Sequence, residues 1–167
     1  GGIVPGVADT PGGVIERTTD GAPNGILAEG AGASVRALHK RSQAQLAEAA
    51  REFIRYFNSL GLTAFKEPMA YEAEMQAYHA ADQRGELTLH MAAHLVRQSP
   101  MSSDPVPYDT LERMRRDYAS VNIRTGFAKL FLDGVAPGHT ASFIEPYLAS
   151  SGYDVASHDP DATLLLD

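Results

Sequence analysis

The stretch on which the fold depends is Phe127-Ala128-Lys129-Leu130-Phe131-Leu132-Asp133-Gly134. Its apolar side chains and the glycine at its end predict a short buried strand over residues 127–133. Side chains alternate between the two faces of a strand, so Lys129, Phe131 and Asp133 share one face, whereas Ala128 and the two leucines share the other. We expect the second face to pack in the core. The first face places two charges in an apolar run, and a buried charge is costly unless it is paired or binds a metal.

These charges have two structural explanations besides a functional one. Four strand steps put Lys129 and Asp133 about 13 Å apart, too far for a direct ion pair along one strand. Alternatively, Lys129 stands at the mouth of the strand with its amine in water. Charged residues in an apolar run indicate a functional site only in some proteins. On the strand pattern alone, a functional site at Lys129 is therefore a hypothesis.

Composition restricts the class of protein. The 167 residues suffice for one domain with a core, and 44% apolar with 21% charged residues is typical of a globular protein. A net charge of −7 without a Lys/Arg cluster argues against nucleic-acid binding. There is no cysteine, which excludes disulfides and thiolate metal sites within this chain. No apolar run of membrane-spanning length occurs, so we expect no membrane partner.

The N-terminal residues lack the basic and apolar regions of a signal peptide, which favours a cytoplasmic location. They also lack an initiator methionine, so we expect this chain to be an internal part of a longer protein.

Periodicity predicts the order of the elements. Asp20-Gly21, between short apolar runs at 14–17 and 25–29, predicts a β-hairpin. Helices are predicted at 31–40, 43–60, 70–84 and about 110–119, the last capped by Asp109, and strands at 62–67, 87–96 and 127–133. The apolar stripe expected along the second helix is Leu46, Ala50, Phe53, Phe57 and Leu60.

This alternation of strands and helices predicts an α/β fold with a parallel sheet and right-handed crossovers. Two architectures agree with this order of elements. One is an open doubly wound sheet, such as a flavodoxin-like domain, and the other is part of a (β/α)₈ barrel. No glycine-rich phosphate loop and no nucleophile elbow is present, so a nucleotide site or a serine hydrolase is not expected.

Histidines supply the remaining candidates for a site. His90 and His94 lie on one face of a strand about 13 Å apart and cannot chelate one ion between them. His94 is nearer the C-terminal end of its strand, where barrels and open sheets place their sites. His139 follows Asp133-Gly134 in a Pro/Gly loop and is able to reach such a site.

Several motifs, in order, resemble amidohydrolase family 3, the metal-dependent hydrolases that include deformylases of N-substituted formamides. Pro11-Gly12-Gly13-Val14-Ile15-Glu16-Arg17 and Asp20-Gly21-Ala22-Pro23-Asn24-Gly25-Ile26-Leu27-Ala28-Glu29 resemble its P-G-G-x-I-x-R and D-G-x-P-x-G-x-L-x-E ribbon. Asn58-Ser59-Leu60-Gly61-Leu62-Thr63 resembles its L-x-x-L-G-I-T-S step. The residues from Lys129 to Ala136, with Thr140-Ala141 and Glu145-Pro146-Tyr147, resemble its K-x-F-x-D-G, T-A and E-P-Y block. Together these matches cover residues 11–147.

The resemblance implies a TIM-like (β/α)₈ barrel, of which this chain holds about strands 2–4, with a small N-terminal β-ribbon. It implies hydrolysis of a non-peptide carbon–nitrogen bond, in a small amide-type substrate, by metal-activated water. Lys129 falls where the superfamily often has a carboxylated lysine that bridges two metals, and carboxylation turns the amine into an oxygen ligand suited to Zn²⁺. His94, Asp133 and His139 are then expected at the substrate pocket.

The chain also departs from the family pattern. Lys66-Glu67-Pro68 stands where the second strand usually closes with Asp, and His139 stands where a basic residue usually precedes the threonine. The family's H-x-H pair, later histidines and catalytic aspartate are not in this sequence. We therefore expect Lys129 as the one metal ligand, no catalytic residue, and an inactive isolated chain.

The expected organisation is a Gly/Pro-rich lead and ribbon at 1–30, a partial barrel at 31–150 and an irregular tail at 151–167. Exposed barrel edges favour self-association. The alternative is a non-catalytic α/β domain for binding or regulation, in which Lys129 is an ordinary amine.

Overall fold

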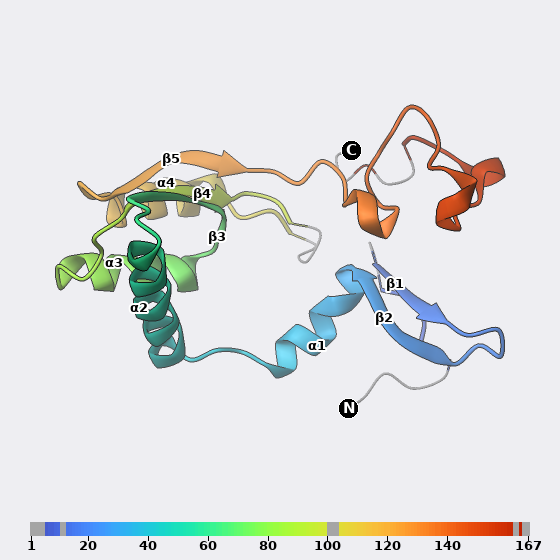
Figure 1. The fold of residues 1–167 in the computed structure, drawn as a ribbon, viewed down its shortest axis with the longest axis horizontal. Helices are drawn as coiled ribbons and strands as arrows, with labels where there is room; N and C mark the ends of the chain where they lie inside the picture. Colours follow the sequence, from blue (N-terminus) through green and yellow to red (C-terminus); the bar gives the residue numbers. More distant parts are fainter. Residues whose placement is uncertain (1–5, 11–12, 100–103, 162–163, 165–167) are drawn as a thin grey trace. The chain divides into compact units, whose positions relative to one another are not determined.

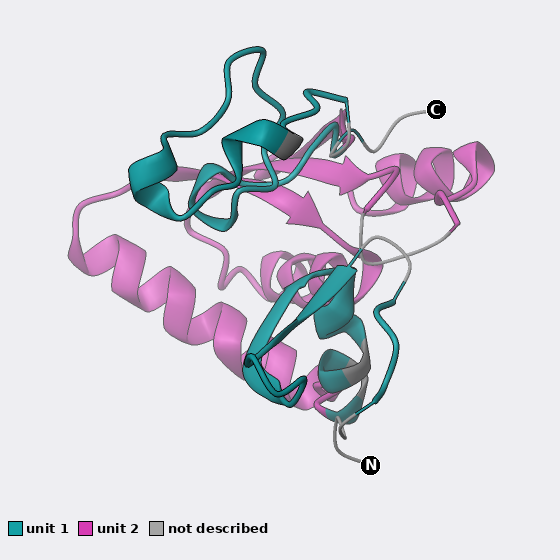
Figure 2. Ribbon diagram, turned by 90° about the vertical axis from the view of Figure 1, so that its right-hand side faces the viewer, with its two compact units in different colours: residues 1–38, 100–103, 131–167 teal, residues 39–99, 104–130 magenta. Residues whose placement is uncertain are grey.

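The computed structural model describes residues 6–10, 13–99, 104–161 and 164. These residues form two compact units (Figure 2). Unit 1 contains the described residues up to Leu38 and from Phe131 onward, and unit 2 contains His39–Ser99 and Asp104–Leu130. The candidates are therefore divided, with His94 and Lys129 in unit 2 and Asp133 and His139 in unit 1.

Unit 2 is an α/β unit built on a three-stranded parallel sheet (Figure 1). Its strands lie in the order β3 (Ala64–Ala70), β4 (His90–Val96) and β5 (Ile123–Lys129). Helix α2 (Gln43–Ser59) precedes β3, α3 (Glu72–Gln83) connects β3 to β4, and α4 (Tyr108–Asp117) connects β4 to β5. The parallel sheet predicted from the alternation of elements is confirmed. Over the described residues the sheet does not close into a barrel.

The core of unit 2 lies between the helices and one face of the sheet. On β4, Met91, Ala93 and Leu95 are at most 3% exposed, and the residues between them are not part of the core. Residues of all three helices pack with them in one cluster, among them Met75 and Met114. Alternation along each strand thus directs one set of side chains to the helices and the other set away from them.

Helix α2 has the clearest sequence determinants. Ser42 accepts a hydrogen bond from the Gln45 backbone N–H, and the Gln45 side chain accepts one from the Ser42 N–H, which is a capping box. The expected stripe is buried at Leu46 and Ala50, but Leu60 is 58% exposed. Leu60 is the residue after the last helical turn, so it no longer follows the helical period.

The strand expected at 127–133 was misplaced by four residues. β5 begins at Ile123, which is 1% exposed and pairs with Met91, and it ends at Lys129, which pairs with Val96. Because β4 ends at Val96, the chain beyond Lys129 has no strand to pair with. The expectation that Leu130 and Leu132 are core residues was therefore wrong: they are 44% and 52% exposed.

Other boundaries differ less. The strands expected at 62–67 and 87–96 begin at Ala64 and His90, and β3 continues through Pro68 to Ala70. α4 begins at Tyr108 after Pro107, so Asp109 is not its cap but lies in its first turn. Proline fixes a backbone angle that suits the start of a helix, which places the start ahead of Asp109.

Unit 1 contains the predicted hairpin. β1 (Gly13–Arg17) pairs antiparallel with β2 (Pro23–Glu29), and Gly21 in the turn has φ +83°. The 3₁₀ helix η1 (Gly30–Gly32) and the short helix α1 (Ala33–Leu38) follow. The C-terminal part of the unit carries the 3₁₀ helices η2 (Ala136–Gly138), η3 (Ala149–Ser151) and η4 (Val155–Ser157).

Within the part of the chain that is described, no helix combines the length and apolar character needed to cross a membrane.

Candidate functional site

Lys129 is the last residue of β5, at the carboxyl edge of the parallel sheet. Its side chain is half-buried, and its carbonyl oxygen accepts a 2.9 Å hydrogen bond from the backbone N–H of Arg97. Parallel α/β sheets place their ligand sites at this edge, because the connecting loops meet there. The lysine thus stands at a position from which a side chain can reach a ligand.

His94 lies on the adjacent strand, paired with Phe127. The two rings stack, with 4.8 Å between their centroids and 12° between their planes. Since Phe127 and Lys129 are two residues apart on β5, all three side chains belong to the same face of the sheet. The structure therefore places two of the four predicted residues, His94 and Lys129, on one face of neighbouring strands.

Two further residues at this edge were missed in the sequence. Nη1 of Arg97 donates a 2.6 Å hydrogen bond to the Val106 carbonyl, and its guanidinium carbon lies 4.3 Å from the centroid of the Tyr108 ring. Tyr71, which follows β3, donates its hydroxyl to Oγ of Ser99 at 3.1 Å. These contacts hold the connections that follow β3 and β4. Nothing in the local pattern links Arg97 to residues nine and eleven positions later.

Asp133 and His139 lie in the loop that follows Phe131 in unit 1. Oδ2 of Asp133 accepts a 2.9 Å hydrogen bond from the Ser142 backbone N–H, so this carboxylate closes a loop. His139 has φ +53° in the left-handed region, and its ring centroid lies 4.8 Å from that of Tyr147 and 5.5 Å from that of Tyr153. The histidine is thus part of an aromatic cluster.

A second group of contacts ties this loop to the ribbon. Gly134 donates its N–H to the Thr140 carbonyl at 2.9 Å, and Thr140 Oγ1 donates to Oε1 of Glu29 at 2.6 Å. A Cβ at Gly134 would lie 2.1 Å from Thr140 Oγ1, so only glycine fits there. The Asp-Gly, Thr-Ala and ribbon motifs noticed in the sequence therefore meet in one unit.

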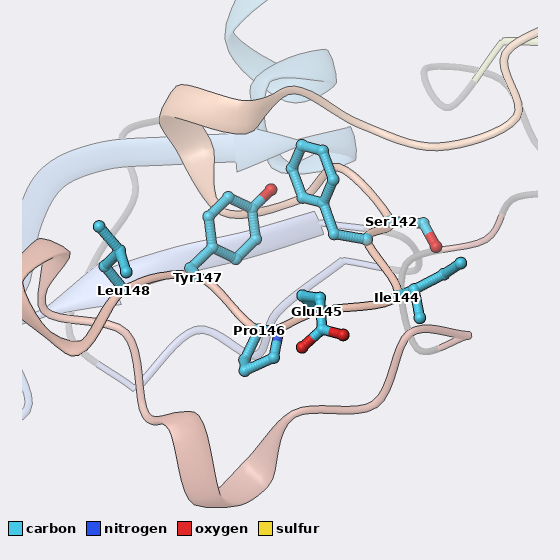
Figure 3. A pocket seen from close by; sticks show the side chains of 7 residues that line it. Ser142, Ile144, Glu145, Pro146, Tyr147 and Leu148 are labelled. Atoms are coloured by element: carbon cyan, nitrogen blue, oxygen red, sulfur yellow. The ribbon is translucent and has the colours of Figure 1, made fainter.

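Residues 142–148 of the same unit line a shallow depression (Figure 3). Ile144 and Leu148 are 89% and 76% exposed, and Glu145 is the one charged residue of this lining. The depression is open and mostly apolar. Besides Glu145, its polar side-chain groups are the hydroxyls of Ser142 and Tyr147, which donate hydrogen bonds to the carbonyls of Pro160 and Ala141.

The shifted pKa values of unit 2 belong to the helical layer. Arg113 donates two hydrogen bonds, of 2.7 and 2.9 Å, to the carboxylate of Glu72, and these lower the pKa of Glu72 although partial burial opposes them. The hydroxyl of Tyr118 donates a third, which lowers that pKa further. Burial, with Glu67 and Glu74 nearby, raises the pKa of Tyr78 to about 12. These groups join α3 to its neighbours and do not form a catalytic pair.

The described residues do not fit a metal centre. No three His, Asp or Glu side chains among them gather closely enough to hold an ion. A protein metal site needs three or four ligands with a fixed geometry, and Lys129 with His94 does not supply them. No catalytic step through a metal follows from these residues alone.

A comparison with protein families identifies the family of the chain. The model of the amidohydrolase family matches residues 2–165. No curated protein and no solved structure matches the chain. Because the family match spans nearly every residue, the chain belongs to the amidohydrolase family.

Proposed function

We propose that this chain is a barrel segment of a hydrolase that acts on non-peptide carbon–nitrogen bonds, with N-substituted formamides as the substrate class. Membership of the amidohydrolase family supports hydrolysis of carbon–nitrogen bonds. The ribbon and the Asp-Gly block that resemble the formamide deformylases support the narrower substrate class.

The observation that carries the proposal is the position of Lys129. It ends the last of three parallel strands joined by helical crossovers, in a chain of this family. In such a segment β3, β4 and β5 correspond to strands 2, 3 and 4 of the barrel. Their outer edges, on β3 and β5, are unpaired among the described residues, as expected of a sheet that continues beyond them.

Lys129 is proposed as an oxygen ligand for a divalent metal, Zn²⁺, once its amine is carboxylated. The further ligands have to come from outside the described residues, since those present do not complete a site. His94, Asp133 and His139 are proposed to border the substrate. The isolated chain is accordingly proposed to be inactive.

The first test measures zinc content and hydrolysis for the purified 167-residue chain supplied with zinc and bicarbonate. We expect no stoichiometric zinc and no release of formate from an N-substituted formamide. Stoichiometric zinc together with turnover would overturn the proposal of an incomplete site.

A second test concerns the role of Lys129 in a protein that contains these residues together with a complete ligand set. Lys129→Ala is expected to abolish hydrolysis and zinc binding, and a crystal structure is expected to show carboxylate density on Lys129. Lys40→Ala, which removes an exposed lysine outside every helix and strand, is the matched control. Full activity in Lys129→Ala would instead favour a non-catalytic role for the lysine.

A further inference from the structure

The chain passes from unit 1 into unit 2 through the connection between α1 and α2 (Figure 1). This connection consists of residues 39–42, which belong to no helix or strand and are all exposed. Its two central residues, Lys40 and Arg41, are adjacent cations. Exposed connections between compact units are the usual places where proteases cut a folded chain. The pair thus combines an exposed connection with the side chains that trypsin-like proteases recognise.

Most of the other basic residues are held inside helices or strands. All fourteen lysines and arginines belong to the part of the chain that the structure describes, and ten of them lie in helices or strands. A protease acts on a segment that has left its element, so each of these ten sites requires local opening before it is cut. The remaining four are Lys40, Arg41, Arg84 and Arg97.

Hydrogen bonds restrain two of these four residues. The N–H of Arg84 donates to a carbonyl of α3 at 3.2 Å, and its guanidinium donates two hydrogen bonds, of 2.9 and 2.8 Å, to Glu86. The N–H of Arg97 donates to the Lys129 carbonyl at 2.9 Å, and the Arg97 carbonyl accepts a 2.8 Å hydrogen bond from the Val106 N–H. These bonds have to break before either arginine can enter the active site of a protease.

Lys40 and Arg41 have no such restraint. Within the described ranges, neither residue makes a hydrogen bond or an ion pair. The restraint begins at the next residue, Ser42, whose N–H donates to the Gln45 side chain at 2.9 Å and whose hydroxyl caps α2. A protease can therefore reach the peptide bonds around Lys40 and Arg41 with little loss of native hydrogen bonds.

Helix α1, on the N-terminal side of the pair, is short. Its six residues fall below the length at which isolated helices are stable, about 12–15 residues. Two of its apolar side chains, Val35 and Leu38, are 38% and 66% exposed, so packing holds its last turn weakly. Unwinding of that turn lengthens the extended segment that a protease can bind, whereas the capping box keeps the start of α2 in place.

A second pair of adjacent cations shows what the fold contributes. Arg115 and Arg116 lie in α4, and Met114, which precedes them, is 3% exposed in the core of unit 2. Arg115 also pairs with Glu112, one turn earlier, at 2.9 Å. Cleavage at this pair requires α4 to leave the core. The sequence therefore offers two pairs of adjacent cations, and the fold protects the second one.

Cleavage at Lys40 or Arg41 leaves the two parts of unit 1 on different fragments. The ribbon and α1 belong to the N-terminal fragment, and the residues from Phe131 onward belong to the C-terminal fragment. These two segments form one compact unit (Figure 2), and the 2.6 Å hydrogen bond from Thr140 to Glu29 connects them. Contacts within unit 1 thus hold the fragments together after the peptide bond is lost.

We propose that Lys40-Arg41 is a cleavage site for proteases that recognise basic residues, and that the two fragments remain associated after the cut. Water hydrolyses the peptide bond that follows Lys40 or Arg41. The carbon–nitrogen bond breaks, the carbonyl carbon gains an oxygen and becomes a carboxylate, and the nitrogen becomes a new amino terminus. The protease supplies the catalytic groups. The proposal goes beyond the hydrolase function of the chain and does not depend on it.

Limited proteolysis of the folded 167-residue chain with trypsin tests the proposal. Intact-mass measurement over a time course identifies the first products. We expect the first cut after Lys40 or Arg41, with a C-terminal fragment that begins at Arg41 or Ser42. Gel filtration of the cut chain in native buffer is expected to give one peak that contains both fragments, at the elution volume of the uncut chain.

The site variant Lys40→Gln/Arg41→Gln removes both basic side chains of the connection. Its first cut is expected to be at least about tenfold slower than that of the parent, since the remaining sites require local opening. The matched control Arg115→Gln/Arg116→Gln removes the same charges from α4 and is expected to be cut as fast as the parent. Parent chain that is unfolded in advance is expected to be cut at both pairs, which separates the effect of the fold from the sequence preference of trypsin.

Several results would contradict the proposal. A first cut at Arg84, at Arg97 or inside a helix or strand would show that the connection is not the preferred site. The same conclusion follows if the site variant is cut as fast as the parent while its far-UV circular dichroism matches that of the parent. Fragments that elute separately in native buffer would show that unit 1 does not hold them together.

Discussion

The hydroxyl of Thr140 donates a 2.6 Å hydrogen bond to the carboxylate of Glu29, a residue 111 positions earlier in the chain. Glu29 itself has φ +49°, which is uncommon for a residue other than glycine. The same hydroxyl accepts a 2.9 Å hydrogen bond from the Val135 N–H. One side chain therefore connects β2 with the loop that follows β5.

Replacing this threonine is expected to loosen that loop. Thr140→Val keeps the shape but removes both hydrogen bonds, and we expect a loss of about 1–3 kcal/mol in the stability of unit 1. Hydrogen exchange at the Val135 amide is the local readout and should accelerate. Thr140→Ser retains the hydroxyl and should exchange nearly as the parent does; equal rates in the valine variant would contradict the assigned role.

A methyl group at Gly134 is expected to disrupt the same contact. Its Cβ would lie 2.1 Å from Thr140 Oγ1 and 2.7 Å from Glu29 Oε1, so Gly134→Ala should destabilise unit 1 by about 1–3 kcal/mol. Gly126→Ala is the matched control, because a Cβ there meets nothing within 4 Å. Urea unfolding of both variants gives the comparison, and similar midpoints would argue against the clash.

The Glu72–Arg113 pair predicts a dependence of stability on acid. Hydrogen bonds from Arg113 lower the pKa of Glu72 in the folded chain below its ordinary value of 4.5. The stabilisation is thus fully present above pH 4.5 and is lost as the pH falls through the folded value. Urea unfolding should show that the parent has a larger free energy of unfolding than Glu72→Gln. This difference should be constant near neutrality and should shrink below pH 4.5. Glu52→Gln alters an exposed ion pair with Arg55 and serves as the control. A difference in unfolding free energy between parent and Glu72→Gln that does not depend on pH would contradict the role of the Glu72–Arg113 pair.

The partly buried Tyr78 predicts that the stability of the folded chain falls as the pH rises in the alkaline range. Folding raises its pKa from 10.0 to about 12, because burial and the neighbouring carboxylates disfavour the phenolate. Its stabilising contribution is present below pH 10 and is lost as the pH rises through 12. Ultraviolet absorbance should show one tyrosine ionising later than the others, and Tyr78→Phe should remove that step. A titration unchanged by the substitution would assign the late step to another tyrosine.

The elements were predictable where local chemistry decides them. The capping box at Ser42 and the apolar period of α2 are contained in consecutive residues, and so is the turn at Asp20-Gly21. The order of strands and helices likewise restricts the sheet to parallel pairing. The motifs that resemble the amidohydrolases were readable for the same reason, and the family match agrees with them.

The candidate site was predictable only in part. The motif places Lys129 on a strand, but neither the end of that strand at Lys129 nor the stacking of His94 on Phe127 could be predicted, because both depend on the register between two strands 33 residues apart. Arg97 carries no local signal, since it follows the end of β4 and its partners Val106 and Tyr108 lie at the far end of the connection to α4.

The sequence by itself thus determined the element types, the parallel sheet and the family, because these depend on periodicity and on short motifs. Only the tertiary structure decided that β5 ends at Lys129 and that Leu130 and Leu132 are exposed, because a strand continues only as far as its neighbour offers hydrogen bonds. It also decided that Thr140 meets Glu29, and that His94 stacks on Phe127. Such relationships arise from cross-strand register and chain closure, which no local pattern encodes.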